Sequence, residues 1–137
     1  MKRILILCTG NSARSQLAEG LMRAEMGDRA EVFSAGMKPS FVRPEAIEVM
    51  HELGIDIRSH RSKSVDEFAG QEFDYVITVC DRANEVCPIF PGQTQRLHWS
   101  FVDPAGTGEP EAVRYASFRK VRDQIRAKIQ DWGLATV

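Results

Sequence analysis

The sequence has few cysteines, and their number and spacing exclude the usual structural roles. Its 137 residues contain three of them, Cys8, Cys80 and Cys87. An odd count this small does not make a framework of structural disulfides. No Cys-x2-Cys pair and no paired-histidine spacing is present, so a zinc site is not expected. The cysteines are therefore candidates for chemistry.

The chain also lacks an excess of either charge and any long apolar run. Its 18 basic and 19 acidic residues give a formal net charge of -1, which favours neither nucleic acid nor a membrane surface as a partner. The first apolar run ends at Leu7, too early for a signal peptide, and no run approaches membrane-spanning length. We expect a cytoplasmic monomer with a single domain over residues 1–137.

Strand and helix patterns alternate along this domain. We predict strands over 2–7, 31–34, 73–79 and 95–99, and helices over 15–26, from 44 to about 53, over 65–68 and from 110 onward. Residues 81–93 are predicted as a loop with at most one helical turn, and 103–108 as a loop. This alternation predicts an α/β fold, a four-stranded parallel sheet flanked by helices on both faces.

The last predicted helix has an apolar stripe at helical spacing, and basic residues lie between its members. We expect the stripe to be buried and the basic residues, Arg122 among them, to form a solvated face. The stripe consists of Phe118, Val121, Ile125, Ile129 and Trp132.

Residues 8–15, here called the anion loop, organise the rest of the chain. They follow a buried strand and open onto a helix, so backbone N–H groups and the helix dipole converge on one point. This geometry predicts binding of a tetrahedral oxyanion. The loop consists of Cys8, Thr9, Gly10, Asn11, Ser12, Ala13, Arg14 and Ser15.

Each polar residue of the loop has a task in this chemistry. Cys8 is the predicted nucleophile, present partly as thiolate beside an arginine and a helix N-terminus, although a lone cysteine after a strand is most often a buried hydrophobe. Arg14 and the loop N–H groups bind and stabilise the oxyanion. Ser15 donates a hydrogen bond to the thiolate. Asn11 suits a left-handed position, or is an ordinary turn residue.

Cys80 and Asp103 lie just after predicted strands, at the edge of the sheet where Cys8 also lies, and Cys87 lies in a nearby loop. Asp103 is the candidate general acid, although Asp-Pro is also a common start of a turn. A thiol at Cys80 can attack an adduct formed on Cys8, and Cys87 can then attack Cys80 and carry the disulfide outward. Such a relay requires the segment from 80 to 87 to move.

The sequence resembles the thioredoxin-coupled arsenate reductases, which share the low-molecular-weight protein tyrosine phosphatase fold. The likeness runs end to end. It is carried by the anion loop with Gln16, and by Ser34-Ala35-Gly36, Gly54-Ile55-Asp56-Ile57, Val79-Cys80, Cys87-Pro88, His98-Trp99, Asp103-Pro104-Ala105 and Phe118 to Asp123.

The resemblance implies reduction of arsenate to arsenite, in arsenic detoxification. Cys8 attacks arsenate, Asp103 aids departure of water, Cys80 attacks Cys8, and Cys87 closes a disulfide with Cys80 that thioredoxin reduces. No cofactor is bound, thioredoxin is the external reductant, and phosphate competes with arsenate. Reductases coupled to glutathione place their later cysteines differently, so the spacing from Cys80 to Cys87 favours thioredoxin.

The sequence departs from the family at two positions. Part of the family holds a potassium ion beside the loop, through matches to Asn11, Glu19 and Ser34 and an acidic residue. Here the acidic position is Lys63, and we expect its ammonium to replace the ion and to pair with Glu19. Ala13 takes a position that is cysteine in several relatives, which leaves the redox steps to Cys80.

Two alternatives remain. A low-molecular-weight tyrosine phosphatase would use Cys8, Arg14 and Asp103 through a phosphocysteine. Such phosphatases usually carry tyrosines after Asp-Pro, where this chain has Ala105-Gly106, and they need neither later cysteine. A non-catalytic phosphate-binding module is the second alternative, and turnover with any reductant would exclude it.

Overall fold

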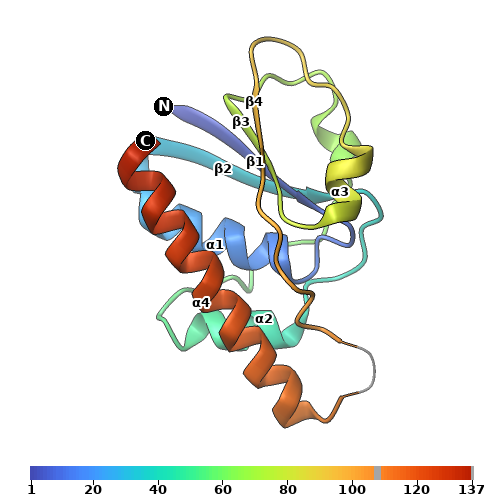
Figure 1. Ribbon diagram of the computed structural model, residues 1–137, viewed down its shortest axis with the longest axis vertical. Coiled ribbons are helices and arrows are strands. Elements are labelled where there is room, and N and C mark those ends of the chain that lie inside the picture. The colour runs from blue at the N-terminus through green and yellow to red at the C-terminus, as the bar shows by residue number, and fades with distance from the viewer. Residues whose placement is uncertain (107–108, 137) are drawn as a thin grey trace.

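The protein contains one parallel sheet of four strands, in the order β2-β1-β3-β4 (Figure 1). The computed structural model describes residues 1–106 and 109–136, so Thr107 and Gly108 of the predicted loop and Val137 of the predicted domain lie outside the described residues. The predicted sheet is confirmed, and each strand begins and ends within two residues of its predicted bounds. The strands are β1 (Lys2–Cys8), β2 (Ala30–Gly36), β3 (Tyr75–Thr78) and β4 (Gln95–His98).

Helices cover both faces of the sheet, as predicted. Figure 1 shows α1, α2 and α4 gathered on one side and α3 on the other. Within the described parts of the chain, no helix is long and apolar enough to cross a membrane. The helices are α1 (Arg14–Met26), the short η1 (Gly27–Arg29), α2 (Pro44–His51), the short η2 (Val65–Phe68), α3 (Asp81–Val86) and α4 (Glu111–Thr136).

Strand β1 is buried on both faces, because its apolar run has no polar position. Ile4, Leu5, Ile6 and Leu7 are all fully buried. Leu5 pairs with Phe33 of β2, whose ring packs against Phe68 of η2 at a centroid distance of 5.6 Å. A continuous apolar run of this kind is typical of a central parallel strand, and it places the residue that follows it, Cys8, at the carboxyl edge of the sheet.

Two predictions about helices were wrong. The segment after Cys80 forms α3, a helix of six residues, and not a loop with a single turn. Its one buried residue, Ala83, gives too weak an apolar pattern to detect. Arg122 of α4 is not on a solvated face, because its guanidinium reaches the Val49 carbonyl at 2.8 Å and Glu52 at 2.7 Å, and the residue is 7% exposed.

The apolar stripe of α4 is buried at four of its five predicted positions. The fifth, Trp132, is half-buried, and its ring packs edge-on against Tyr75 at 5.1 Å and against Trp99 at 5.5 Å. Because Tyr75 begins β3 and Trp99 follows β4, these ring contacts pack the C-terminal part of α4 against β3 and β4.

Candidate active site

The Cys8 sulfur lies at the floor of the anion loop and is surrounded by hydrogen-bond donors. The backbone N–H of Asn11 points to it at 3.2 Å, and the Ser15 hydroxyl lies 2.9 Å away. The Ser15 oxygen also accepts a hydrogen bond from the Asn11 amide nitrogen at 2.8 Å. Because that oxygen is already an acceptor, the Ser15 proton is free to point at the sulfur, which is the arrangement that stabilises a thiolate.

Asn11 holds the loop in shape. Its backbone has a φ of 48°, in the left-handed region that asparagine tolerates, and Asn11 is therefore not an ordinary turn residue. Its side-chain nitrogen bridges Ser15 and the Ser34 hydroxyl, at 2.8 and 2.9 Å, while its oxygen accepts from the Lys63 backbone N–H at 3.0 Å. Asn11 is fully buried and thus ties the loop to α1, β2 and the segment that precedes η2.

The segment that follows β2 donates hydrogen bonds to carbonyl groups of the anion loop. Four backbone N–H groups bond to four loop carbonyls, which leaves loop N–H groups available for an anion. These bonds run from Met37 to Cys8, from Lys38 to Thr9, from Ser40 to Gly10 and from Arg43 to Ser12, at 2.8 to 3.2 Å. Nothing in the spacing of residues 37–43 indicates this role, and sequence reasoning missed it.

Gly36 allows this segment to come close to the loop. A Cβ at this position would lie 2.6 Å from the Thr9 carbonyl oxygen and 2.9 Å from the Asn11 nitrogen. Those atoms belong to the backbone of the loop and cannot move without reshaping it. A glycine is therefore required at the end of β2.

Arg14 begins α1 and lies beside the predicted general acid. Its guanidinium donates to the Phe101 carbonyl at 3.1 Å and approaches the Asp103 carboxylate at 3.9 Å. The Arg14 side chain is 17% exposed and that of Asp103 is 55% exposed. The structure therefore brings these two residues together at the mouth of the site, with the carboxylate on the solvent side.

Cys80 and Cys87 lie at the two ends of α3, as its N-cap and C-cap residues. Cys80 is buried, and its sulfur lies 3.4 Å from the Thr9 hydroxyl, so it borders the anion loop. Cys87 is half-buried, and burial raises the pKa of its thiol above the ordinary value, an effect that Arg96 opposes. All three cysteines are free thiols.

Glu19 is a buried carboxylate, 3% exposed, behind the loop. It accepts a hydrogen bond from the Ser34 hydroxyl at 2.6 Å and another from Arg23 at 3.0 Å. Ser34 in turn accepts from Asn11, so a continuous chain of hydrogen bonds joins Glu19 to the groups around Cys8. Ser15, Glu19 and Arg23 recur every four residues along α1. That polar stripe on a buried helix is the signal that could have revealed this chain from the sequence.

Lys63 and His60 face the same carboxylate from the segment before η2. The Lys63 ammonium lies 3.8 Å from one Glu19 oxygen, and His60 Nε2 lies 3.4 Å from the other. Burial lowers the pKa of both groups, and the charge of Glu19 opposes that shift in each. A resident potassium ion does not fit this arrangement, because an ammonium takes the place where an oxygen ligand would be needed.

His60 is held in turn by Gln16, which sequence reasoning had not assigned a role. The Gln16 side-chain oxygen lies 3.0 Å from His60 Nδ1. Its amide nitrogen donates to the backbone carbonyls of Asn11 and Arg61, both at 3.1 Å. Gln16 thus links the anion loop to the segment that carries Lys63.

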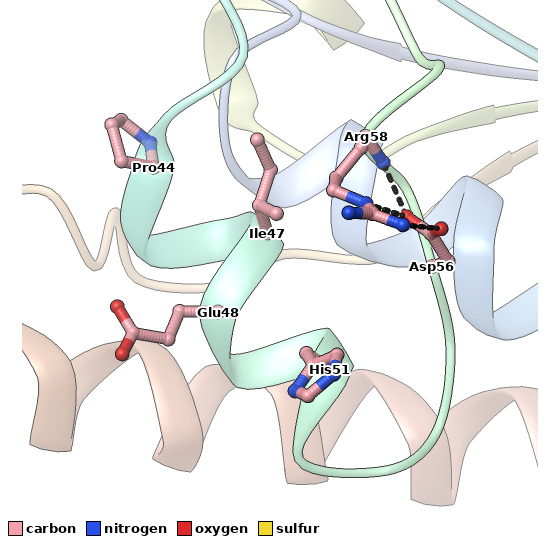
Figure 2. A pocket seen from close by; sticks show the side chains of 6 residues that line it. All are labelled: Pro44, Ile47, Glu48, His51, Asp56 and Arg58. Atoms are coloured by element: carbon pink, nitrogen blue, oxygen red, sulfur yellow. Dashed lines mark hydrogen bonds and ion pairs between the residues drawn. The ribbon is translucent and has the colours of Figure 1, made fainter.

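A pocket of about 380 Å³ lies elsewhere, between α2 and the segment that follows it (Figure 2). Pro44, Ile47, Glu48 and His51 of α2 line one side, and Asp56 and Arg58 the other. Arg58 donates two side-chain hydrogen bonds to Asp56, which lower the pKa of that carboxyl to about 2. None of the predicted site residues lines this pocket, so it is separate from the anion loop.

Residues 3–137 match the family described as low molecular weight phosphotyrosine protein phosphatase. The chain belongs to this family. The resemblance and the fold class expected from the sequence are thereby confirmed. The match extends over almost the whole chain, and the residues of the anion loop lie within it.

Within the family, the chain is similar to proteins named as arsenate reductases. One from Halalkalibacterium halodurans is 43% identical over 132 residues, which is 96% of this chain and 95% of that protein. A solved structure of an arsenate reductase in the phosphate binding state has 31% identity and a TM-score of 0.77, and the match covers 96% of this chain and 95% of the other. A thioredoxin-dependent arsenate reductase of Corynebacterium glutamicum has 28% identity and a TM-score of 0.71, over 99% of this chain and 64% of that one.

Proposed function

We propose that this protein reduces arsenate to arsenite and that thioredoxin regenerates it. The observation that carries the proposal is the contact between the Thr9 hydroxyl and the Cys80 sulfur, at 3.4 Å. This contact places a second thiol, that of Cys80, next to the anion loop. A reductase requires a second thiol there, and a phosphatase does not. The relatives named as arsenate reductases support the same conclusion.

The first step is attack of the Cys8 thiolate on arsenic. The substrate oxygens bind to the loop N–H groups and to Arg14, which turns from Phe101 and Asp103 toward the anion. A sulfur–arsenic bond forms, and one arsenate oxygen leaves as water with a proton supplied by Asp103. The donors from Asn11 and Ser15 favour the thiolate before attack, and Ser15 stays within reach of the sulfur afterwards.

The second step transfers two electrons to arsenic. The Cys80 thiolate attacks the Cys8 sulfur, so a Cys8–Cys80 disulfide forms and the sulfur–arsenic bond breaks with its electron pair on arsenic. Arsenic(V) becomes arsenic(III) and leaves as arsenite. Strands β1 and β3 are neighbours, with Leu7 opposite Thr78, and adjacent strands lie about 4.8 Å apart. This spacing supports direct exchange between the thiols that follow them.

The third step moves the disulfide to the surface. The Cys87 thiolate attacks the Cys80 sulfur and releases the Cys8 thiolate for another cycle. Helix α3 must unwind first, because Cys80 and Cys87 cap its two ends and seven steps of about 1.5 Å rise place their Cα atoms about 10 Å apart. A disulfide needs them within about 7 Å. The unwound segment then presents the Cys80–Cys87 disulfide to the two thiols of thioredoxin, which suits a reducing cytoplasm.

Lys63 replaces a metal ion behind the loop in this proposal. Its ammonium offsets the negative charge of Glu19. Glu19 therefore needs no bound metal ion while it accepts the hydrogen bond from the Ser34 hydroxyl. Ser34 holds Asn11, and Asn11 orients Ser15 toward Cys8. The site therefore carries its own fixed cation.

The test is arsenate-dependent oxidation of NADPH in the presence of thioredoxin and thioredoxin reductase. Wild type should turn over continuously, and Cys87→Ser should stop after one turnover with Cys8 and Cys80 joined. Continued turnover by Cys87→Ser would move the last step to an external thiol. Hydrolysis of an aryl phosphate by wild type, with no arsenate-dependent turnover, would instead establish the phosphatase alternative.

A further inference from the structure

His98, the last residue of β4, joins three elements next to Cys80. Its Nε2 lies 3.0 Å from the carboxylate of Asp81, the first residue of α3. Its Nδ1 lies 2.8 Å from the hydroxyl of Thr78, the last residue of β3, which is 2% exposed. Both ring nitrogens therefore have a partner, and the ring has one orientation. We call this set of three residues the His98 brace.

The brace fastens α3 at the end that carries Cys80. Ser100, just beyond β4, adds a hydrogen bond of 3.3 Å to the same Asp81 oxygen. Helix α3 has six residues, of which Ala83 alone is buried. A helix this short is not stable by itself, so its persistence depends on contacts with the rest of the fold. Among these, the brace joins the first turn of α3 directly to the sheet.

We propose that His98 is a positioning residue that keeps α3 wound while Cys80 and Cys87 are thiols, and so sets how readily the two form a disulfide. The inference rests on the relay proposed above, in which that disulfide requires α3 to unwind. Unwinding changes the backbone at Asp81 and withdraws its carboxylate from the ring. The brace therefore stabilises the dithiol form and is absent from the disulfide form.

The sign of the effect follows from this difference. Loss of the brace raises the free energy of the dithiol form and leaves that of the disulfide form unchanged. The disulfide then becomes harder to reduce, so its reduction potential becomes more negative. A merely structural contribution of His98, present in both forms, would destabilise the protein without moving this potential.

The experiment measures the redox equilibrium of Cys80 and Cys87 in a Cys8→Ser background, where no other disulfide can form within the chain. The protein is equilibrated with mixtures of reduced and oxidised dithiothreitol, so each disulfide formed in the protein consumes one in the reagent. His98→Ala should shift the midpoint ratio about threefold to tenfold toward the disulfide, which corresponds to about 15 to 30 mV more negative for a two-electron couple. Asp81→Asn, which keeps an acceptor oxygen, should give a smaller shift.

Two comparisons separate the brace from other causes. Replacing His98 by Ala in an Asp81→Ala background should produce little further shift, because the partner is already gone. Asp56→Ala removes another exposed pair, that with Arg58 in the pocket beside α2, and should leave the midpoint unchanged. Equal midpoints for His98→Ala and its parent would overturn the proposal. If the Cys8→Ser parent formed no Cys80–Cys87 disulfide at any ratio, the relay itself would be wrong.

Discussion

The hydroxyl of Thr9 lies 3.4 Å from the sulfur of Cys80, although the two residues are 71 positions apart in the chain. Thr9 follows the nucleophile in the anion loop, and Cys80 follows β3. The contact gives Cys80 a hydrogen-bond donor at the edge of the site where a Cys8 adduct would form. It also supplies a direct way to separate the second step from the first.

Replacing Thr9 by Val should slow the attack of Cys80 without abolishing adduct formation. The hydroxyl can donate to the sulfur as it becomes charged, and a hydrogen bond to a charged group contributes about 1.5 to 3 kcal/mol, so we expect a loss of about tenfold or more. The rate of arsenite release in a single turnover, measured by rapid quench, reports on this step. Thr9→Ser keeps the hydroxyl and should retain most of the rate. Equal rates for Thr9→Val and wild type would show that the contact has no catalytic role.

Gly36→Ala should damage the anion loop. The added Cβ would lie 2.6 Å from the Thr9 carbonyl oxygen, so the loop must shift, and we expect a stability loss of about 1 to 3 kcal/mol. Calorimetric titration with inorganic phosphate measures whether the loop still binds an oxyanion. Gly70→Ala is the control, because φ there is positive but no atom lies within 4 Å of the added Cβ. It should lose stability and keep phosphate binding; unaltered binding in Gly36→Ala would contradict the packing argument.

Lys63→Met should destabilise the fold by leaving the buried Glu19 carboxylate with less positive charge around it. We expect a loss of about 2 kcal/mol, because Arg23 and His60 still face that carboxylate. Urea unfolding measures the loss, and Lys120→Met, on an exposed part of α4, is the matched control. Wild type should unfold at the same urea concentration in sodium and in potassium chloride. A clear stabilisation of wild type by potassium would show that Lys63 has not replaced an ion.

Cys87 should react slowly at neutral pH and faster as the pH rises. Burial raises the pKa of its thiol, so less thiolate is present at a given pH than for an ordinary cysteine. The rate of alkylation by iodoacetamide in Cys8→Ser/Cys80→Ser, where Cys87 is the only cysteine, should rise with a midpoint above the ordinary value of about 8.5. Arg96→Ala should move the midpoint higher still, because Arg96 opposes the shift. A midpoint at or below the ordinary value would be evidence that Cys87 is solvated.

Local features of the site were predictable because their parts are contiguous in the chain. An apolar strand, a loop of small residues and a helix follow one another from Ile4 to Ser15, and the positive φ of Asn11 belongs to the same stretch. The alternation of patterns was sufficient for the parallel sheet. It was insufficient for α3, because six residues with a single buried position carry too little periodicity.

The sequence by itself determined the sheet, the anion loop and the place of Cys8 at the floor of that loop. Each of these features depends on residues that are neighbours in the chain and on which of their side chains are apolar and must be buried. Tertiary structure decided the rest. The strand order β2-β1-β3-β4 brings Cys80 to Thr9, and the packing of the segment before η2 brings His60 to Glu19. These pairs are set by where whole elements bury their apolar faces, a global property that the spacing of the polar residues does not encode.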